Sequence, residues 1–167
     1  MPTVNAFVFR EMDEASARQI AGWRYPPPYD LYHPAPDAAE AFIQGLLTPH
    51  FRYYTVWDGQ NELIAFRCFG EDAQVPGGDY GAEALDMGGG LRPDLTGQGL
   101  GASLLEAALE FAEQQFAPRV FRVTVAAFNR RALRVCVKVG FQPVQTFLHS
   151  TSGQAFVVLL RAARTKA

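Results

Sequence analysis

Cysteine and histidine are scarce in this sequence, and neither residue type forms a pattern of metal ligands. Cys68 and Cys136 lie far apart and make no C-x-x-C pair. The three histidines, at positions 33, 50 and 149, have no metal-ligand spacing, so we expect no metal site. Two cysteines this far apart are typical of reduced, buried thiols in a cytoplasmic protein.

Long hydrophobic runs and an excess of one charge are also missing. Hydrophobic residues make up 49% of the chain, but no run approaches the length of a membrane span. Residues 1–6 lack the basic region and the apolar core of a signal peptide. A formal net charge of −2 gives no electrostatic case for nucleic-acid binding. We therefore expect a cytoplasmic protein without membrane or nucleic-acid partners, folded as a single domain over residues 1–167.

Glycine, by contrast, is concentrated where a strand pattern meets a helix pattern. Gly97, Gly99 and Gly101 alternate within residues 96–102, which we call the glycine loop, and apolar residues at helical spacing follow. Glycines let the backbone approach a ligand closely. The start of a helix adds N–H groups without internal partners and a partial positive charge. The glycine loop therefore predicts a site for the phosphates of a cofactor.

Several explanations compete for this loop. An ordinary strand-to-helix turn needs one glycine rather than three. A dinucleotide fold fits Gly97, Gly99 and Ala102, but residues 116–122 lack the acidic residue that should follow about twenty positions later. A nucleotide P-loop requires Gly-Lys-Ser or Gly-Lys-Thr, which this sequence does not contain. The remaining explanation is a resemblance: Leu91-x-Pro93, followed by Thr96-Gly97-Gln98-Gly99-Leu100-Gly101, is similar to the acyl-CoA pyrophosphate loop of the GNAT superfamily of N-acetyltransferases.

A second segment, residues 129–141, supports the same resemblance. Asn129 is a good N-cap, and Gly140 suits the left-handed residue that ends a helix. The segment resembles the second GNAT signature, N-x-x-A-x-x-[LV]-Y-x-[KR]-x-G-F. The matching residues are Asn129, Ala132, Val135, Lys138, Gly140 and Phe141. The arginines at positions 130, 131 and 134 are interpreted as a solvated helix face or as contacts for cofactor phosphate.

Alternating strand and helix patterns predict a mixed α/β (α+β) sheet covered by helices, in the order βααβββαβαββ. This is the topology that the GNAT resemblance implies. We expect strands at residues 6–10, 51–58, 62–69, 82–92, 120–126, 142–149 and 155–161. We expect helices from Asp13 or Ser16 to Gly22, after a cap at Asp37, from the glycine loop to about Phe116, and from Asn129 to Gly140.

The resemblance implies acetyl-CoA as the co-substrate and places its binding site on particular residues. The implied cofactor-binding residues are Gly89, Gly90, Leu91, Thr96, Gly97, Gln98, Gly99, Leu100, Gly101, Ala102 and Asn129. The backbone N–H of Leu91 would polarise the acetyl carbonyl. A run of glycines at residues 88–90 suits a strand that something approaches closely, and it also fits a β-bulge without a ligand.

The chain departs from the family pattern where proton transfer is expected. Thr96 stands where the family usually has Arg or Gln, and Cys136 replaces the tyrosine proposed to protonate the leaving thiolate. Thr124 replaces the glutamate base common in members that acetylate protein N-termini. Cys136 could supply the proton, although a small buried helix residue is the interpretation we favour. Asp86 and Glu83 are candidate bases, with Asp86 closer to the expected acetyl position, and a solvated acid at the end of a strand is the alternative.

Residues 25–33, which we call the acceptor loop, are the candidate wall of the acceptor site, because the resemblance implies that the region between the first two helices serves there. Tyr25, Tyr29, Tyr32 and His33 offer aromatic faces and hydroxyls, and Asp30 could pair with a cationic substrate. A proline-stiffened loop that only covers the core is the alternative.

The predicted function is transfer of an acetyl group from acetyl-CoA to a primary amine of a small molecule or peptide, by direct attack in a ternary complex. An acyl-CoA-binding or sensing module with weak or no transfer activity is the other hypothesis. The sequence leaves open whether the chain forms a homodimer.

Overall fold

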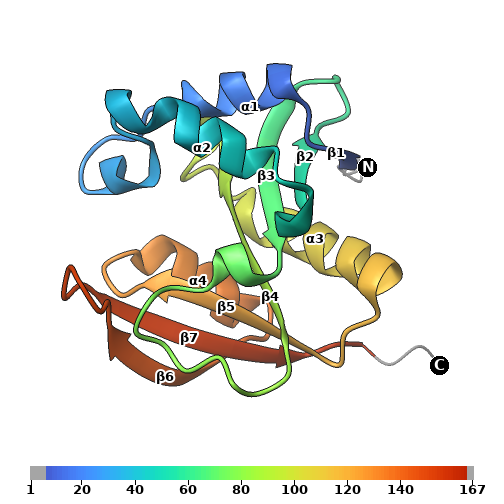
Figure 1. Cartoon of the computed structure of the whole chain (residues 1–167). Coiled ribbons are helices and arrows are strands. Elements are labelled where there is room, and N and C mark those ends of the chain that lie inside the picture. Colours follow the sequence, from blue (N-terminus) through green and yellow to red (C-terminus); the bar gives the residue numbers. More distant parts are fainter. Residues whose placement is uncertain (1–6, 165–167) are drawn as a thin grey trace. The chain divides into compact units, whose positions relative to one another are not determined.

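A computed structural model of the chain describes residues 7–164 and divides them into two compact units, each built from two chain segments (Figure 1). The first unit holds the described residues through Cys68 together with Gly89–Gln98. The second holds Phe69–Gly88 and the chain from Gly99 onward. The helices and strands follow the predicted order βααβββαβαββ, so the predicted mixed α/β fold is confirmed. A single domain over residues 1–167 stays a prediction.

The first unit is organised around an antiparallel meander of β1 (Val8–Glu11), β2 (Tyr53–Trp57) and β3 (Leu63–Phe69). Residue 6 of the first predicted strand lies outside the described residues. The predicted hairpin between β2 and β3 is confirmed. Asn61 takes a left-handed conformation there (φ +60°), and the backbone N–H of Asp58 donates to Glu62 at 3.0 Å.

Two short helices, α1 (Glu14–Ala21) and α2 (Ala39–Leu46), supply the core of the first unit. Asp13 caps α1, because its carboxylate accepts the Ser16 N–H at 2.7 Å. The prediction that Asp37 caps α2 is wrong: Pro36 starts a 3₁₀ turn, Pro36–Ala38, and α2 begins without a side-chain cap. The buried residues of this core are Ala17, Ile20, Ala21, Trp23, Ile43, Leu46 and Leu63.

The second unit contains the strand order β4-β5-β7-β6, within a seven-stranded mixed sheet whose β4 (Leu85–Leu91) belongs to both units. β4 runs parallel to β5 (Val120–Ala126), from Leu85 opposite Phe121 to Met87 opposite Val123. β7 (Ala155–Ala162) pairs antiparallel with β5 and with β6 (Gln142–Leu148), which confirms the second predicted hairpin.

Helices α3 (Gly101–Phe116) and α4 (Arg130–Lys138) complete the second unit. α3 buries an apolar stripe that includes Leu104, Leu105, Ala108, Leu109 and Ala112. It ends at Ala117, which is left-handed (φ +46°) and directly precedes Pro118. Within residues 7–164, no helix combines the length and the apolar character needed to cross a membrane.

Candidate functional site

Two glycines near the end of β4, Gly89 and Gly90, pack closely against β3 in the first unit. Gly89 has φ +153°, and a Cβ atom there would overlap the carbonyl oxygen of Phe66. A Cβ atom on Gly90 would lie 2.8 Å from the Phe66 ring. Close approach of β3 therefore gives both glycines a structural reason, since no side chain fits at either position. Their role in cofactor binding stays a prediction.

The last residue of β4, Leu91, is held from two sides. The backbone N–H of Arg92 donates to the carbonyl of Ile64 on β3 at 2.8 Å. The carbonyl of Leu91 accepts the hydroxyl of Tyr25 at 2.7 Å. The peptide plane between Leu91 and Arg92 is therefore fixed at both of its polar atoms. This plane adjoins the Leu91 N–H, which we predict to polarise the acetyl carbonyl.

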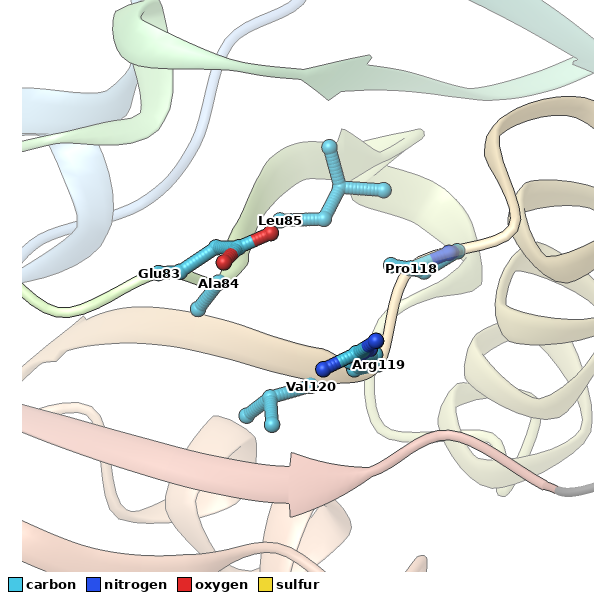
Figure 2. Close-up of a pocket in the computed structure, with 6 residues that line it drawn as sticks. All are labelled: Glu83, Ala84, Leu85, Pro118, Arg119 and Val120. Carbon is cyan, nitrogen blue, oxygen red and sulfur yellow. The ribbon is translucent and has the colours of Figure 1, made fainter.

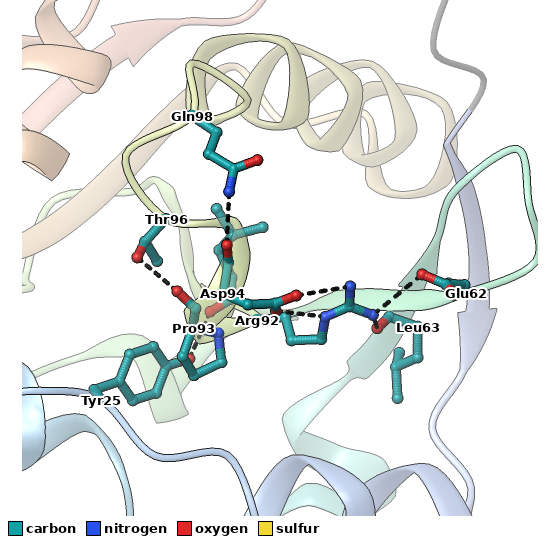
Figure 3. Close-up of polar contacts among 9 residues, drawn as sticks. Tyr25, Glu62, Leu63, Arg92, Pro93, Asp94, Thr96 and Gln98 are labelled. Atoms are coloured by element: carbon teal, nitrogen blue, oxygen red, sulfur yellow. Dashed lines mark hydrogen bonds and ion pairs between the residues drawn. The ribbon is translucent and has the colours of Figure 1, made fainter.

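The part of the glycine loop in the first unit is folded on itself (Figure 3). After the 3₁₀ turn Pro93–Leu95, the Thr96 hydroxyl donates to the carbonyl of Pro93 at 2.7 Å. The Gln98 side chain donates to the carbonyl of Asp94 at 2.8 Å. Gly97 is left-handed, with φ +76°. Thr96 therefore closes the turn locally, whereas the family's usual Arg or Gln at this position carries a longer polar side chain.

An ion pair at the end of β4 braces the same turn (Figure 3). The guanidinium of Arg92 donates to both carboxylate oxygens of Asp94, at 2.7 and 3.2 Å. It also donates to the Leu63 carbonyl at 3.2 Å and lies 3.5 Å from the Glu62 carboxylate. Hydrogen bonding to Asp94 raises the pKa of Arg92, and Arg92 in turn lowers the pKa of Asp94 below its usual range. The turn that precedes Thr96 is thus held in one conformation by charged groups.

The second unit contributes the part of the loop that opens α3. Gly99 is left-handed (φ +79°), and a Cβ atom built there meets nothing within 4 Å. Leu100, the N-cap of α3, makes no side-chain hydrogen bond to the helix. A Cβ atom on Gly101 would lie 3.0 Å from a methyl group of Val135 on α4, so glycine permits this packing. α3 therefore begins without a side-chain cap, just after a glycine whose Cβ side is open, and a helix start of this kind suits an anion.

The signature helix α4 uses its predicted residues for local structure. The Asn129 side chain accepts the Ala132 N–H at 3.2 Å, so the predicted N-cap is confirmed. Gly140 has φ +103° directly after the helix, as the sequence predicts. Cys136 is 6% exposed, which supports the interpretation that its thiol packs as a small apolar group. Its assignment as a proton donor stays a prediction.

The candidate base Asp86 lies in a buried network of the second unit. Its two carboxylate oxygens accept Nε and Nη2 of Arg122 at 2.7 and 2.8 Å, and Gln74 donates to it at 2.9 Å. Asp86 and Arg122 are 5% and 4% exposed. Arg122 also donates to the Ala82 carbonyl and stacks on the Tyr80 ring at 4.9 Å. These contacts give Asp86 a structural role in joining β4 to β5, and its catalytic role stays a prediction.

Sequence reasoning missed this network, although one signal for it was present. Arg122 stands between Phe121 and Val123 and is the one charged residue of β5. A charged residue at such a position is rarely buried without a partner, so this arginine predicts an acidic residue close to it in the fold. The hydrogen bond between Arg122 and Asp86 raises the pKa of the guanidinium, which stays charged.

The other candidate base, Glu83, lies just before β4, at the opposite end of the strand from Leu91. It borders a pocket of about 180 Å³ in the second unit (Figure 2). The pocket is lined by Glu83, Ala84, Leu85, Pro118, Arg119 and Val120. These residues begin β4 and β5, whereas the predicted acetyl site uses the end of β4. Glu83 as a base stays a prediction without a supporting contact.

The structure brings the aromatic residues of the acceptor loop together. The rings of Tyr25 and His33 stack with centroids 6.3 Å apart, and Tyr25 meets Tyr32 edge-on at 6.4 Å. Tyr29 stacks on Tyr32, also at 6.4 Å. The Tyr25 N–H donates to Nδ1 of His33 at 3.1 Å, which closes the loop. Tyr32 and Leu31 remain 36% and 49% exposed, so the cluster presents apolar surface to solvent, and its role in substrate binding stays a prediction.

Comparisons with known proteins agree on one family. Residues 16–141 match the model of the Acetyltransferase (GNAT) family. The chain is similar to the crystal structure of spermidine N-acetyltransferase from Vibrio cholerae in complex with CoA and spermine: the TM-score is 0.65 at 17% identity, over 94% of this chain and 95% of that one. An acetyltransferase (GNAT family) from Bacillus anthracis gives a TM-score of 0.71 at 13% identity, over 94% and 95% of the two chains. No curated protein matches the sequence. At these identities the likeness to solved structures shows the fold.

Proposed function

This chain belongs to the acetyltransferase (GNAT) family, and we propose that it transfers an acetyl group from acetyl-CoA to a primary amine of a small molecule or peptide. The observation that carries the proposal is the start of α3. Gly99 leaves open space beside uncapped N–H groups, in a loop whose sequence resembles the family's pyrophosphate site. The residues present therefore fit the phosphates of acetyl-CoA.

The remaining contacts of the co-substrate follow from the same assignment. The amides of residues 97–102 would hold the pyrophosphate, Asn129 would contact the pantetheine arm, and the Leu91 N–H would donate to the acetyl carbonyl. The amine nitrogen attacks the carbonyl carbon, the C–S bond breaks, the nitrogen loses a proton and the thiolate gains one. In this proposal the Leu91 N–H would stabilise the negative charge that develops on the carbonyl oxygen, and the two hydrogen bonds at the strand end would keep it oriented.

A thermal melt with acetyl-CoA tests the binding step. Ligand at about 100 times its Kd stabilises the native state by about 2.7 kcal/mol, which in a chain of this size raises the Tm by about 5–10 °C. We expect a rise of this size with acetyl-CoA and none with pantetheine, which lacks the phosphates. An unchanged Tm at millimolar acetyl-CoA would contradict the proposal.

The acceptor is proposed by class. The acceptor loop offers aromatic faces and Asp30, which suit an amine carried on a cationic or partly apolar molecule. The spermidine N-acetyltransferases with a similar fold make polyamines the first compounds to test. A panel of polyamines, amino acids, aminoglycosides and peptide N-termini, measured by release of the coenzyme thiol, identifies the acceptor.

An acyl-CoA-binding or sensing module is the second candidate function, and two contacts favour it. The Asp86 carboxylate is engaged by Arg122, and the Cys136 thiol is buried, so neither of these two candidate proton-transfer groups is exposed. This candidate predicts the same thermal stabilisation by acetyl-CoA but no thiol release with any amine in the panel. Turnover with one acceptor excludes it.

Replacing Cys136 by alanine separates packing from catalysis. We expect a lower Tm, because the buried sulfur leaves a small cavity, and turnover within about twofold of the wild type. The matched control is Cys68→Ala, since Cys68 is also buried and lies on β3. A loss of about 10²-fold in kcat for Cys136→Ala alone, at unchanged Tm, would instead identify the thiol as the general acid.

A further inference from the structure

The Tyr25 hydroxyl meets the backbone at the one strand end that the proposed reaction uses. It donates to the carbonyl of Leu91 at 2.7 Å, and it would lie 3.3 Å from a Cβ atom on Gly90. The ring is held in place by His33 and Tyr32, so the hydroxyl has little freedom to move. All of these residues belong to the first unit.

The hydrogen bonds of the strand show which edge of β4 the hydroxyl occupies. The Arg92 N–H points toward β3, because it donates to Ile64. In a planar trans peptide, the carbonyl of Leu91 points the opposite way. In an extended strand, the N–H and the carbonyl of one residue share an edge. The Tyr25 hydroxyl therefore lies on the same edge of β4 as the Leu91 N–H, the edge away from β3.

The chemistry of the Tyr25 hydroxyl favours one role, that of a hydrogen-bond acceptor. Its proton is used by the Leu91 carbonyl, but a phenol oxygen also accepts hydrogen bonds. Burial raises the pKa of Tyr25 to about 12. Such a phenol is a far weaker acid than a free thiol, whose pKa is ~8.5, and is therefore a poor proton donor to the coenzyme thiolate. At neutral pH the group is therefore a fixed hydrogen-bond acceptor beside the expected position of the acetyl carbonyl.

We propose that the Tyr25 hydroxyl oxygen accepts a hydrogen bond from the acceptor amine and aims the nitrogen lone pair at the carbonyl carbon held by the Leu91 N–H. This inference rests on the proposed acetyl transfer and adds a determinant of acceptor choice. A primary amine keeps one N–H for Tyr25 and one to lose as the amide forms, whereas a secondary amine has a single N–H. Tyr25 thus favours primary over secondary amines.

The test compares Tyr25→Phe with the wild type in two reactions of the same protein. With the best amine of the panel, we expect kcat/KM to fall by about 10–100-fold, the scale of one lost hydrogen bond in a buried site. Without amine, the slow hydrolysis of acetyl-CoA should fall much less than amine transfer, because it does not depend on amine orientation and the Arg92 N–H still anchors the strand end to Ile64. The rise in Tm with acetyl-CoA should also be unchanged, which shows that the variant is folded and binds the co-substrate.

Tyr54→Phe on β2 is the matched control, since it removes a tyrosine hydroxyl from the same unit and should leave both reactions unchanged. Equal losses of amine transfer and hydrolysis in Tyr25→Phe would mean that the hydroxyl only braces Leu91, and would overturn the inference. Unchanged amine transfer would overturn it as well. If the wild type shows no thermal shift and no thiol release, the proposed function itself fails, which is a distinct result.

Discussion

Replacing Gly99 by aspartate is expected to abolish the thermal stabilisation by acetyl-CoA, a loss of about 5–10 °C of ligand-induced shift. A Cβ atom at this position meets nothing within 4 Å, so the new side chain stands in the space assigned to the phosphates. Its negative charge then faces the phosphate groups at the start of α3. The measurement is the Tm of the variant with and without acetyl-CoA.

The chain provides a close control for this substitution. Gly153, in the hairpin between β6 and β7, has φ +72° against +79° for Gly99, and a Cβ atom there also meets nothing within 4 Å. Gly153→Asp therefore carries the same left-handed strain and the same added charge. It should lower the Tm of the free protein by a similar amount and keep the full shift with acetyl-CoA. If Gly99→Asp keeps the shift too, the phosphates do not bind at this loop.

The fold could be predicted from the sequence where the signals are local. Caps such as Asp13 and Asn129, the left-handed Gly140, and the hairpin after Asp58 each depend on residues within a few positions. Short-range rules cover such contacts well. The glycine loop belongs to the same class, because its conformation follows from its own glycines and the helix that it opens.

Contacts between residues far apart in the sequence could not be predicted in the same way. The bond from Tyr25 to Leu91 spans 66 positions, and the pair of Asp86 and Arg122 spans 36. Tyr25, Leu91 and Asp86 were predicted as site residues and Arg122 was not, and only the register of the strands and the path of the acceptor loop decide which partner each residue meets. The error at Asp37 has a related cause, since Pro36 starts a 3₁₀ turn before the expected helix.

Removing the arginine of the buried ion pair is expected to have the largest effect on stability. Arg122→Met removes the charged partner of the Asp86 carboxylate, which is 5% exposed in the wild type, and leaves it the hydrogen bond from Gln74. Breaking one side of a buried pair typically costs about 3–5 kcal/mol, equivalent to a fall in Tm of about 6–20 °C in a chain of this size. The measurement is thermal and urea unfolding. The double variant Asp86→Leu/Arg122→Met should recover most of the loss, because it buries no unpaired charge.

Asp86→Asn then distinguishes a structural carboxylate from a catalytic base. If Asp86 only joins β4 to β5 through Arg122, the variant loses stability, and kcat stays within about threefold of the wild type at temperatures where it is folded. A base would instead lower kcat by about 10²-fold or more and remove a limb of the pH profile. Glu40→Gln is the control, since its ion pair with Arg18 has side chains 70% and 48% exposed and its loss should leave the Tm nearly unchanged. The bidentate contact and the burial of both partners favour the structural outcome. In that case the reaction draws its proton transfers from water or from the acceptor loop.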